Sequence, residues 1–302
     1  MRTVFPWIAS LAGAGVLAAQ PVFETTALLA DRSGAAKEIH LLSAAGSTIR
    51  YRSADSKEVT EGTVPEGGTL FIPEPPDFSE AMDLYQARKF TEAKARFAAV
   101  KQQFAPVHTL KNNPAALAAF YELECLRKLG DLDGLAAALQ GFSKDALTDE
   151  TQLRQMELYL LWDAVRSKNW ELAGRLANER AKTRLPGDQR AQVAWCHGLA
   201  VENLGRPREA LFLYQTAMTA DAGASVEIAR QAALRVLAIH KADPAVQAAI
   251  KAWGAKDEDK TSQGRAALLE AAAVARLYEL ALGGGTPLPA EYKTLPAFKD
   301  GE

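Results

Sequence analysis

Between residues 78 and 282, apolar side chains recur with the spacing of amphipathic helices, in a chain rich in Ala, Leu, Glu, Lys and Arg. β-Branched runs are few there, so the pattern predicts helices rather than strands. Short polar turns divide the helices into consecutive hairpins, which gives a mainly α fold. The predicted pairs are 78–86 with 91–104, 114–129 with 132–142, 150–167 with 170–183, 188–204 with 208–219, and 225–241 with 244–253, followed by a last helix at 262–282.

One local pattern returns four times at the turns of these hairpins. A turn is followed by an aromatic or stiff apolar residue and, three positions later, by a small or apolar residue on the same helix face. The copies are Arg88-Lys89-Phe90 with Ala93, Gly130-Asp131-Leu132 with Leu135, Lys168-Asn169-Trp170 with Ala173, and Gly205-Arg206-Pro207 with Ala210. Because the copies recur every 37 to 42 residues, they indicate stacked helical hairpins, an architecture that presents a surface rather than a reaction centre.

The pattern is different before the helices. Between residues 37 and 72, runs of four to six residues with β-branched and aromatic side chains are separated by Gly and Asp-Ser turns. This predicts three or four short antiparallel strands. Residues 25–30 suit either a strand or a helix. We assign residues 20–73 to a small β module. We expect it to pack against the first helices, since its strand region at residues 37–72, about 35 residues, cannot bury a secure core alone.

Two boundaries follow from proline and glycine. Three prolines between positions 73 and 76 predict an extended linker at residues 74–77, with Asp77 as the N-cap of the first helix. Three consecutive glycines end the last helix. Residues 283–302 are therefore predicted to form an extended C-terminal tail that either lies on the helices or stays free.

Two copies of the repeat resemble tetratricopeptide repeats of exported bacterial envelope proteins. The residues that carry the resemblance are Trp195, Gly198, Ala210, Tyr214 and Ala217 in one copy, and Tyr85, Phe90, Ala93 and Phe97 in the other. The resemblance covers roughly residues 78–222 and implies a solenoid in which Gly198 allows two helices to approach closely. The repeat length of 37 to 42 residues departs from the usual value of about 34 residues, so the resemblance predicts stacked hairpins without a regular superhelix.

The resemblance also implies a binding surface, because the first helix of each such repeat lines a concave groove. The candidate partner-binding residues at the matching positions are Phe120, Leu158, Trp162, Trp195 and Leu199. The Lys, Asn and Arg residues with which some members of the family bind carboxylate tails are missing here, so that activity is not carried over. The apolar groove is predicted either to bind a hydrophobic peptide or helix, or to be filled from within by the β module or by Tyr292 and Phe298 of the tail.

The N-terminus has the pattern of a cleaved signal peptide. Met1-Arg2 gives a positive start, residues 4–19 are uncharged, and Ala18-Ala19 provides the small residues of a cleavage site. The uncharged run is interrupted by proline and glycine and is shorter than the roughly 20 apolar residues of a spanning helix. We predict a signal peptide at residues 1–19, export to the periplasm or the cell exterior, and no membrane span in the mature protein.

Charge and chemistry narrow the classes of function. With 35 basic and 37 acidic side chains, the 302 residues carry a net charge of -2, which gives no field that would favour nucleic acid. Cys125 and Cys196 lie on non-adjacent repeats and are predicted to be buried free thiols. The four histidines lack the spacing of metal ligands and no catalytic motif is found, so neither a metal nor a cofactor is predicted.

These patterns predict a non-catalytic scaffold of the periplasm or cell envelope that binds a protein or peptide partner in the groove of the repeats. The alternative is a glycan- or cell-wall-associated accessory protein or enzyme with a site between the β module and the solenoid. In that case Tyr51 and Phe71 are expected to stack on a sugar. The oligomeric state is left open.

Overall fold

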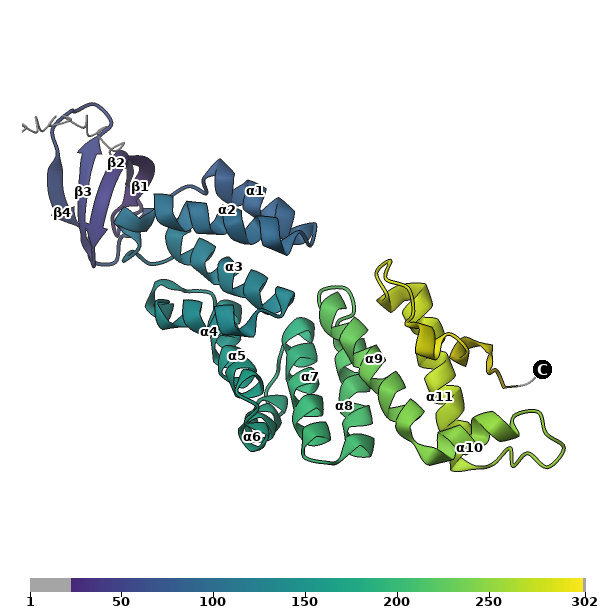
Figure 1. The fold of residues 1–302 in the computed structure, drawn as a ribbon. Helices are drawn as coiled ribbons and strands as arrows, with labels where there is room; N and C mark the ends of the chain where they lie inside the picture. Colours follow the sequence, from purple (N-terminus) through teal and green to yellow (C-terminus); the bar gives the residue numbers. More distant parts are fainter. Residues whose placement is uncertain (1–22, 301–302) are drawn as a thin grey trace, which may run out of the picture.

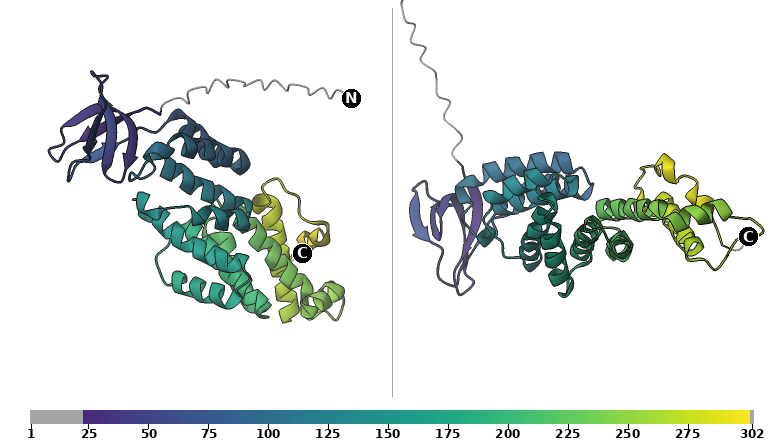
Figure 2. Two further views of the ribbon diagram at one scale, coloured as in Figure 1. Left: turned by 60° about the vertical axis from the view of Figure 1, so that its left-hand side comes forward. Right: turned by 60° about the horizontal axis from the view of Figure 1, so that its bottom comes forward.

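The computed structural model describes residues 23–300, and the fold is mainly helical with a small antiparallel sheet at its N-terminal side (Figure 1). The helices lead away from the sheet in chain order, in Figure 1 and in the two views of Figure 2. The predicted signal peptide lies outside the described residues. Among residues 23–300, no helix has both the length and the hydropathy that a membrane crossing requires.

The sheet has five strands in the order β4-β3-β2-β1-β5, with every neighbouring pair antiparallel. The strands are β1 (Thr25–Ala30), β2 (Ala36–Ala45), β3 (Thr48–Ser53), β4 (Thr60–Thr63) and β5 (Thr69–Phe71). The four strands β2 to β5 confirm the prediction of three or four strands between residues 37 and 72. The ambiguous segment at residues 25–30 is a strand, and it pairs with both β2 and β5.

The helical region contains eleven α-helices within the described residues. They are α1 (Pro76–Gln86), α2 (Phe90–Gln103), α3 (Pro114–Leu129), α4 (Leu132–Gln140), α5 (Glu150–Arg166), α6 (Trp170–Ala181), α7 (Gly187–Asn203), α8 (Pro207–Ala220), α9 (Val226–Ala242), α10 (Pro244–Ala252) and α11 (Gln263–Leu277). The ten paired helices agree with the predicted ranges to within two residues at each end. The last predicted helix divides into α11 and a π-helical turn at Tyr278–Leu282.

The start of α1 corrects one prediction. The helix begins at Pro76, and Asp77 lies in its first turn instead of capping it. Proline is tolerated there because the first N–H groups of a helix have no partner within the helix. The carboxylate of Asp77 still lies near the positive end of the helix dipole. The extended backbone of the linker therefore ends at Pro75.

One face of the sheet packs against the first helices, as expected. The side chains that it buries there are Ala27, Leu29, Ile39, Leu41 and Ile49. They share one hydrophobic cluster with side chains of α1, α2 and α3, among them Phe78, Phe97 and Ala118. We call this the first hydrophobic cluster. A sheet of this size thus gains its second layer from the helices.

The helices form two rows. Within residues 23–300, the odd-numbered helices contact one another in succession, α5 with α7, α7 with α9 and α9 with α11, whereas no two even-numbered helices make comparable contact. Each even-numbered helix packs instead between its two odd-numbered neighbours in the chain, as α8 does between α7 and α9. The odd-numbered helices are therefore the more closely spaced row.

The predicted tail lies on the helices. Leu288, Tyr292 and Leu295 are buried in the same hydrophobic cluster as residues of α9 and α11. The guanidinium of Arg276 donates hydrogen bonds to the carbonyls of Pro296 at 3.2 Å and Phe298 at 2.8 Å. The tail at residues 283–302 was predicted either to lie on the helices or to stay free, and its described part lies on the helices.

The four turns of the sequence repeat share one backbone geometry. Their left-handed residues are Arg88 (φ 61°), Gly130 (φ 75°), Lys168 (φ 55°) and Gly205 (φ 82°). In each turn the next N–H bonds to the carbonyl five residues earlier, as Asn169 does with Ala164 at 2.9 Å. This is the Schellman arrangement, which satisfies carbonyls at the end of a helix. The repeat seen in the sequence is thus a repeat of backbone structure.

This geometry predicts that Lys168→Gly stabilises the protein. A left-handed conformation costs a non-glycine residue about 1–2 kcal/mol, while glycine loses about 0.5–1 kcal/mol of additional backbone entropy on folding. We expect a gain of up to about 1 kcal/mol in the free energy of unfolding. Lys182→Gly is the control, because Lys182 also ends a helix but has a φ of -80°. Urea denaturation measures both variants, and a stabilisation of the Lys182 variant alone would contradict the prediction.

Gly198 fills the role that the resemblance implies. A Cβ atom built on Gly198 would lie 2.6 Å from Cε1 of Tyr214, so α7 and α8 approach too closely for any larger residue. Tyr214 has no room to retreat, since it is fully buried, its ring lies 5.5 Å from that of Trp195, and its hydroxyl donates to Glu202 at 2.6 Å. A small residue at position 198 is therefore required by packing.

We predict that Gly198→Ala lowers the free energy of unfolding by about 1–3 kcal/mol, the usual cost of overpacking. Gly174→Ala is a matched control on α6, where the added Cβ would lie 3.7 Å from that of Ala200, an ordinary contact. There the better helix propensity of alanine should raise stability by up to about 1 kcal/mol. Thermal and urea denaturation report both values. Equal changes in the two variants would show that the close approach at Gly198 is unimportant.

Candidate functional site

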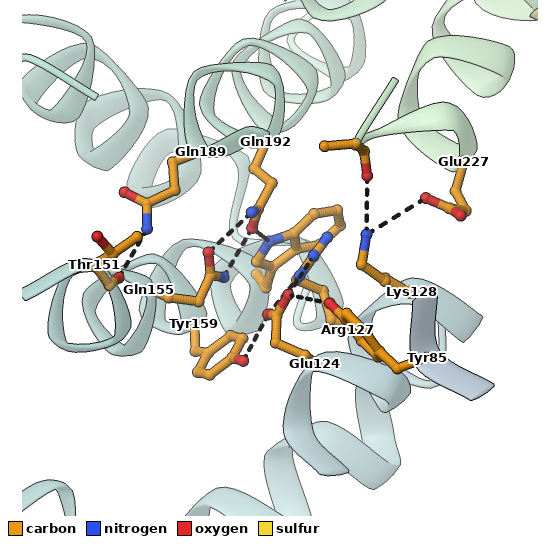
Figure 3. A network of polar contacts seen from close by, with 12 residues as sticks. Tyr85, Glu124, Arg127, Lys128, Thr151, Gln155, Tyr159, Gln189, Gln192 and Glu227 are labelled. Atoms are coloured by element: carbon orange, nitrogen blue, oxygen red, sulfur yellow. Dashed lines mark hydrogen bonds and ion pairs between the residues drawn. The ribbon is translucent and has the colours of Figure 1, made fainter. Parts of the chain in front are cut away.

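Two hydrophobic clusters meet on α3. The first cluster, built by the sheet and α1 to α3, includes no residue after Cys125. The second hydrophobic cluster begins at Leu123 and continues to the tail. Polar side chains are buried where the two clusters meet, on α3, α5 and α7 (Figure 3). We call them the polar cluster, and its members are Glu124, Arg127, Gln155, Tyr159, Trp162, Gln189 and Gln192.

An ion pair lies at the centre of the polar cluster. Glu124 and Arg127 are one helical turn apart on α3, and their side chains are 8% and 5% exposed. The guanidinium donates from Nε to Oε1 at 2.9 Å and from Nη2 to Oε2 at 2.6 Å. Tyr159 of α5 donates to Oε1 at 2.7 Å, and Tyr85 of α1 lies 3.5 Å from Oε2. The carboxylate thus connects three odd-numbered helices.

Both members of the pair stay charged at neutral pH. Burial opposes the ionisation of Glu124, but the charge and hydrogen bonds of Arg127 outweigh it, so the pKa of Glu124 lies below its usual value. Burial likewise opposes the charge of Arg127, and the carboxylate of Glu124 raises the pKa of Arg127 overall. Tyr159 remains a hydrogen-bond donor, because burial and the nearby carboxylate raise its pKa well above the usual value.

Amide groups continue the polar cluster between α5 and α7. Gln155 and Gln192 exchange two hydrogen bonds, each 2.9 Å long. The indole Nε1 of Trp162 donates to Oε1 of Gln192, also at 2.9 Å. Gln189, one turn before, donates to the carbonyl of Thr151. Figure 3 shows the bonds among Gln155, Gln192, Gln189 and Thr151, which connect α5 with α7.

The candidate partner-binding residues are brought onto the odd-numbered helices α3, α5 and α7. Four of them are almost fully buried, with exposed fractions of 5% for Phe120, 1% for Leu158, and 6% for both Trp162 and Trp195. Leu199 is partly buried. Neighbouring helices cover the two tryptophans, Trp162 through Gln192 of α7 and Trp195 through Tyr214 of α8. In this arrangement they stabilise the fold, and contact with a partner stays a prediction.

Neither the β module nor the C-terminal tail fills the space around Trp162 and Trp195, as one of the two predictions had it. Tyr292 lies beneath the amino group of Lys241, and Phe298 packs edge-on against Trp253. Both tail residues thus cover the C-terminal helices rather than Trp162 or Trp195. The sheet covers α1 to α3, and no residue after Cys125 joins that cluster. The space around the two tryptophans is therefore filled by adjacent helices.

A pocket of about 220 Å³ opens beside the polar cluster. Its walls come from the C-terminal ends of α1 and α3, the start of α2, Asp188 of α7 and Ala224 before α9. Lys128 lines it, with Nζ 5.5 Å from the ring centroid of Phe90 and 5.8 Å from that of Tyr85. Burial lowers the pKa of Lys128, and the neighbouring charge of Arg127 lowers it further. The pocket thus combines aromatic rings with three basic side chains.

The aromatic pair of the alternative function lies on two faces of the sheet. Phe71 is paired with Leu28, and both are exposed, at 58% and 39%. Tyr51 is paired with Leu41, which is fully buried. Directly paired residues point to the same face of a sheet, so Tyr51 and Phe71 point to opposite faces. They do not stack on one sugar ring, which corrects the expectation for this pair.

Both cysteines are buried and free, as predicted. Burial raises the pKa of Cys125 to about 12 and also raises that of Cys196, so both thiols are protonated at neutral pH. In the part of the chain that the structure describes, no group of three or more His, Cys, Asp or Glu side chains is placed to hold a metal ion.

The sequence patterns pointed to the apolar residues of the odd-numbered helices and missed most of the polar cluster. One signal was present: Glu124 and Arg127 lie one turn apart within an apolar stretch of α3, and charges on a buried face need partners. Gln155 and Gln192 gave no such signal, because isolated glutamines are common on exposed helix faces. No family model matches the chain, and no curated protein or solved structure matches it either.

The polar cluster predicts that Glu124→Gln is strongly destabilising. Removing one partner leaves the buried guanidinium of Arg127 without its counter-charge, which typically costs about 3–5 kcal/mol. Glu122→Gln is the control on the same helix, because its partner Lys101 is 45% exposed and such pairs contribute about 0–1 kcal/mol. Urea denaturation at neutral pH measures both. A loss in Glu124→Gln as small as that of the control would contradict the assigned role.

The same pair predicts a dependence on pH. Since the pKa of Glu124 is lowered from 4.5 in the folded protein, its stabilisation is complete above pH 4.5 and is lost as the pH falls through the lower folded pKa. The difference in unfolding free energy between the wild type and Glu124→Gln should therefore shrink below pH 4.5. Urea denaturation of both proteins at several values between about pH 3 and about pH 7, a range that spans the usual pKa of a glutamate, measures this difference. A constant difference would show that Glu124 is not the titrating group.

Proposed function

We propose that this chain is a non-catalytic scaffold for protein–protein interactions, built as a solenoid of tetratricopeptide-like hairpins. The observation that carries the proposal is the recurrence of one turn geometry at Arg88, Gly130, Lys168 and Gly205. Each turn is followed by a buried packing residue of the next helix, at positions 93, 135, 173 and 210. Repeats of this kind stack through neighbours and offer an extended surface for binding.

We place the partner on the row of odd-numbered helices, beside the polar cluster. The pocket of about 220 Å³ lies in this row and presents basic and aromatic side chains together, a combination found at the centres of protein interfaces. Gln86 lines the pocket and is exposed, while Asp188 is half-buried.

We further propose that the protein acts in the periplasm or cell envelope. The support is the signal-peptide pattern of residues 1–19. A fold that is held by packing and by hydrogen bonds, with both thiols buried and protonated, is compatible with an oxidising compartment, because such thiols are poor nucleophiles.

The test is partner capture by crosslinking with the mature chain, residues 20–302, and with two variants. Gln86→Trp should block the pocket and reduce recovery of the partner at least tenfold, a change that corresponds to about 1.4 kcal/mol of binding free energy. Glu171→Trp places the same side chain at an exposed position of α6 and should leave recovery unchanged. Quantitative mass spectrometry compares the three.

Two outcomes would count against the proposal. Equal recovery by the wild type and Gln86→Trp would remove the pocket as the binding site. If the wild type enriches no protein over an unrelated helical control, the scaffold function itself is wrong. Helical circular dichroism and thermal denaturation of each variant establish that the added tryptophan has not unfolded the chain.

A further inference from the structure

The strand β5 is an edge of the sheet, and its second side has no partner. It pairs with β1 through Thr69, Leu70 and Phe71, and the sheet ends there. Within residues 23–300, β1 is the one helix or strand that packs extensively against β5. In the same part of the chain, no backbone hydrogen bond outside the helices and strands involves residues 69–74. Along such an edge, alternate N–H and C=O groups point away from the sheet without a partner.

The two edges of the sheet present different side chains. The edge strand β4 is polar and carries the charge of Glu61, which is a common protection of an edge against pairing with another strand. The edge at β5 carries no charge and continues through Leu70, Phe71 and Ile72. Phe71 is 58% exposed, and its two neighbours are half-buried. Pro73 ends this edge, because proline has no N–H to donate. Residues 69–72 thus form a short apolar edge with free backbone groups.

A pocket of about 260 Å³ opens beside the edge at β5. The edge forms one wall, and the starts of α1 and α3 supply Phe78 and Leu117. Leu70 is paired with Leu29, which is buried on the face of the sheet that packs against these helices. A residue of an added strand that is paired with Leu70 would point to the same face. Its side chain would therefore be directed toward the pocket.

The surroundings of this edge are acidic. Four exposed carboxylates lie beside β5 and at the start of α1, at Glu66, Glu74, Asp77 and Glu80. None of them forms an ion pair within residues 23–300, and Glu74 is the one charged side chain that lines the pocket. The basic side chains nearby are Arg32, beside Gly67, and Lys111, next to Asn112 of the pocket. The excess of negative charge favours a partner with basic residues.

We propose that the free edge of β5 binds an extended segment of another protein, which adds one strand to the sheet. The backbone of that segment pairs with residues 69–72, an apolar side chain enters the pocket, and a basic side chain lies beside Glu74. In strand addition, main-chain hydrogen bonds give affinity and pockets for alternate side chains give specificity. The site lies at the start of α3, whereas the pocket beside the polar cluster lies at its end. The inference therefore does not depend on the proposed function.

Synthetic peptides test the site on the unsubstituted mature chain, residues 20–302. The probes have blocked ends and alternate lysine with valine, isoleucine, leucine or phenylalanine over about seven residues, the length of a short strand. Hydrogen exchange followed by NMR measures the protection of each amide. We expect at least one peptide to slow exchange of the outward-pointing amides among residues 69–72 by about tenfold or more. The amides of β4 should keep their exchange rates.

Methylation of the peptide backbone distinguishes strand pairing from apolar binding alone. Successive N–H groups of a paired strand point to opposite sides. Methylating the alternate N–H groups that face β5 should weaken binding of the same peptide by about tenfold, the equivalent of one or two hydrogen bonds. Methylating the other set should leave its affinity nearly unchanged. Equal effects of the two sets would show that the peptide does not bind as a strand and would overturn the proposal.

A charge reversal tests the role of Glu74. Glu74→Lys should weaken the lysine peptide and strengthen the matching glutamate peptide, each by about threefold at low salt, as expected for exposed charges. Glu61→Lys makes the same change of charge at the other edge and should leave both affinities nearly unchanged. Fluorescence polarisation of labelled peptides measures the affinities. A preference that follows Glu61 instead of Glu74 would place the peptide on β4 and would contradict the inference.

Two further outcomes decide against the proposed occupant. If no peptide of the panel protects residues 69–72 at about 1 mM, a concentration that detects even weak binding, the site is wrong. If these amides are protected in the free protein and lose their protection on dilution, a second copy of this chain occupies the edge and the partner segment is wrong. Neither result bears on the scaffold function, which partner capture with Gln86→Trp tests at the other pocket.

Discussion

The buried ion pair between Glu124 and Arg127 is the constraint on which the arrangement of the two halves depends. It lies on α3, where the hydrophobic cluster of the sheet ends and that of the later helices begins. Two charges removed from water are costly unless every hydrogen-bonding group finds a partner. The carboxylate meets this requirement only when α5 supplies Tyr159 at 2.7 Å. A rotation of α5 against α3 would break this bond, so the pair favours one orientation.

Apolar contacts set how closely the helices pack, whereas buried polar contacts determine how the helices are oriented. Small residues such as Ala93, Ala173 and Ala210 are fully buried and set how closely each hairpin packs. Their contacts are non-directional and tolerate sliding. The polar cluster adds direction, because the reciprocal amide pair of Gln155 and Gln192 forms only in one register. Hydrophobic packing thus builds the stack, and the buried hydrogen bonds select its geometry.

The contact at Glu227 extends this division to the surface. Inside the protein, the charged pair on α3 is shielded from water, and its carboxylate accepts a hydrogen bond from Tyr159 of α5. At the pocket, the side chain of Arg88 is 39% exposed, and water and salt weaken its attraction to Glu227. Lys128 is only 10% exposed and is largely shielded from solvent. The same chemistry therefore gives a fully shielded ion pair on α3 and a partly solvated one at the start of α9.

Burial explains why the candidate groove residues were difficult to interpret. Trp162 and Trp195 have the apolar character of a binding surface, yet each is covered by an adjacent helix. Each odd-numbered helix between α5 and α11 contacts other helices on more than one side. Helical periodicity alone therefore does not distinguish a face that binds a partner from a face that packs against a neighbouring helix. Only the exposed fractions of 6% make that distinction.

Features that depend on a few consecutive residues could be predicted from the chain. The helix α3 begins at Pro114 because the side chain of Asn113 accepts the N–H of Ala116, and it ends where Gly130 adopts a positive φ. Such caps act within one or two turns, so they can be recognised without knowledge of the fold. The repeat and nearly all helix boundaries followed from signals of this kind.

Features that depend on distant residues could not be predicted in this way. The register of β5 against β1 puts Phe71 on the face opposite Tyr51, and the packing of the helices brings Arg88 to Glu227. The sequence around either residue of such a pair does not indicate which distant residue it will contact. These contacts contribute energy only after the chain has closed loops of many residues. Tertiary packing therefore determines them, and it also determines the pocket.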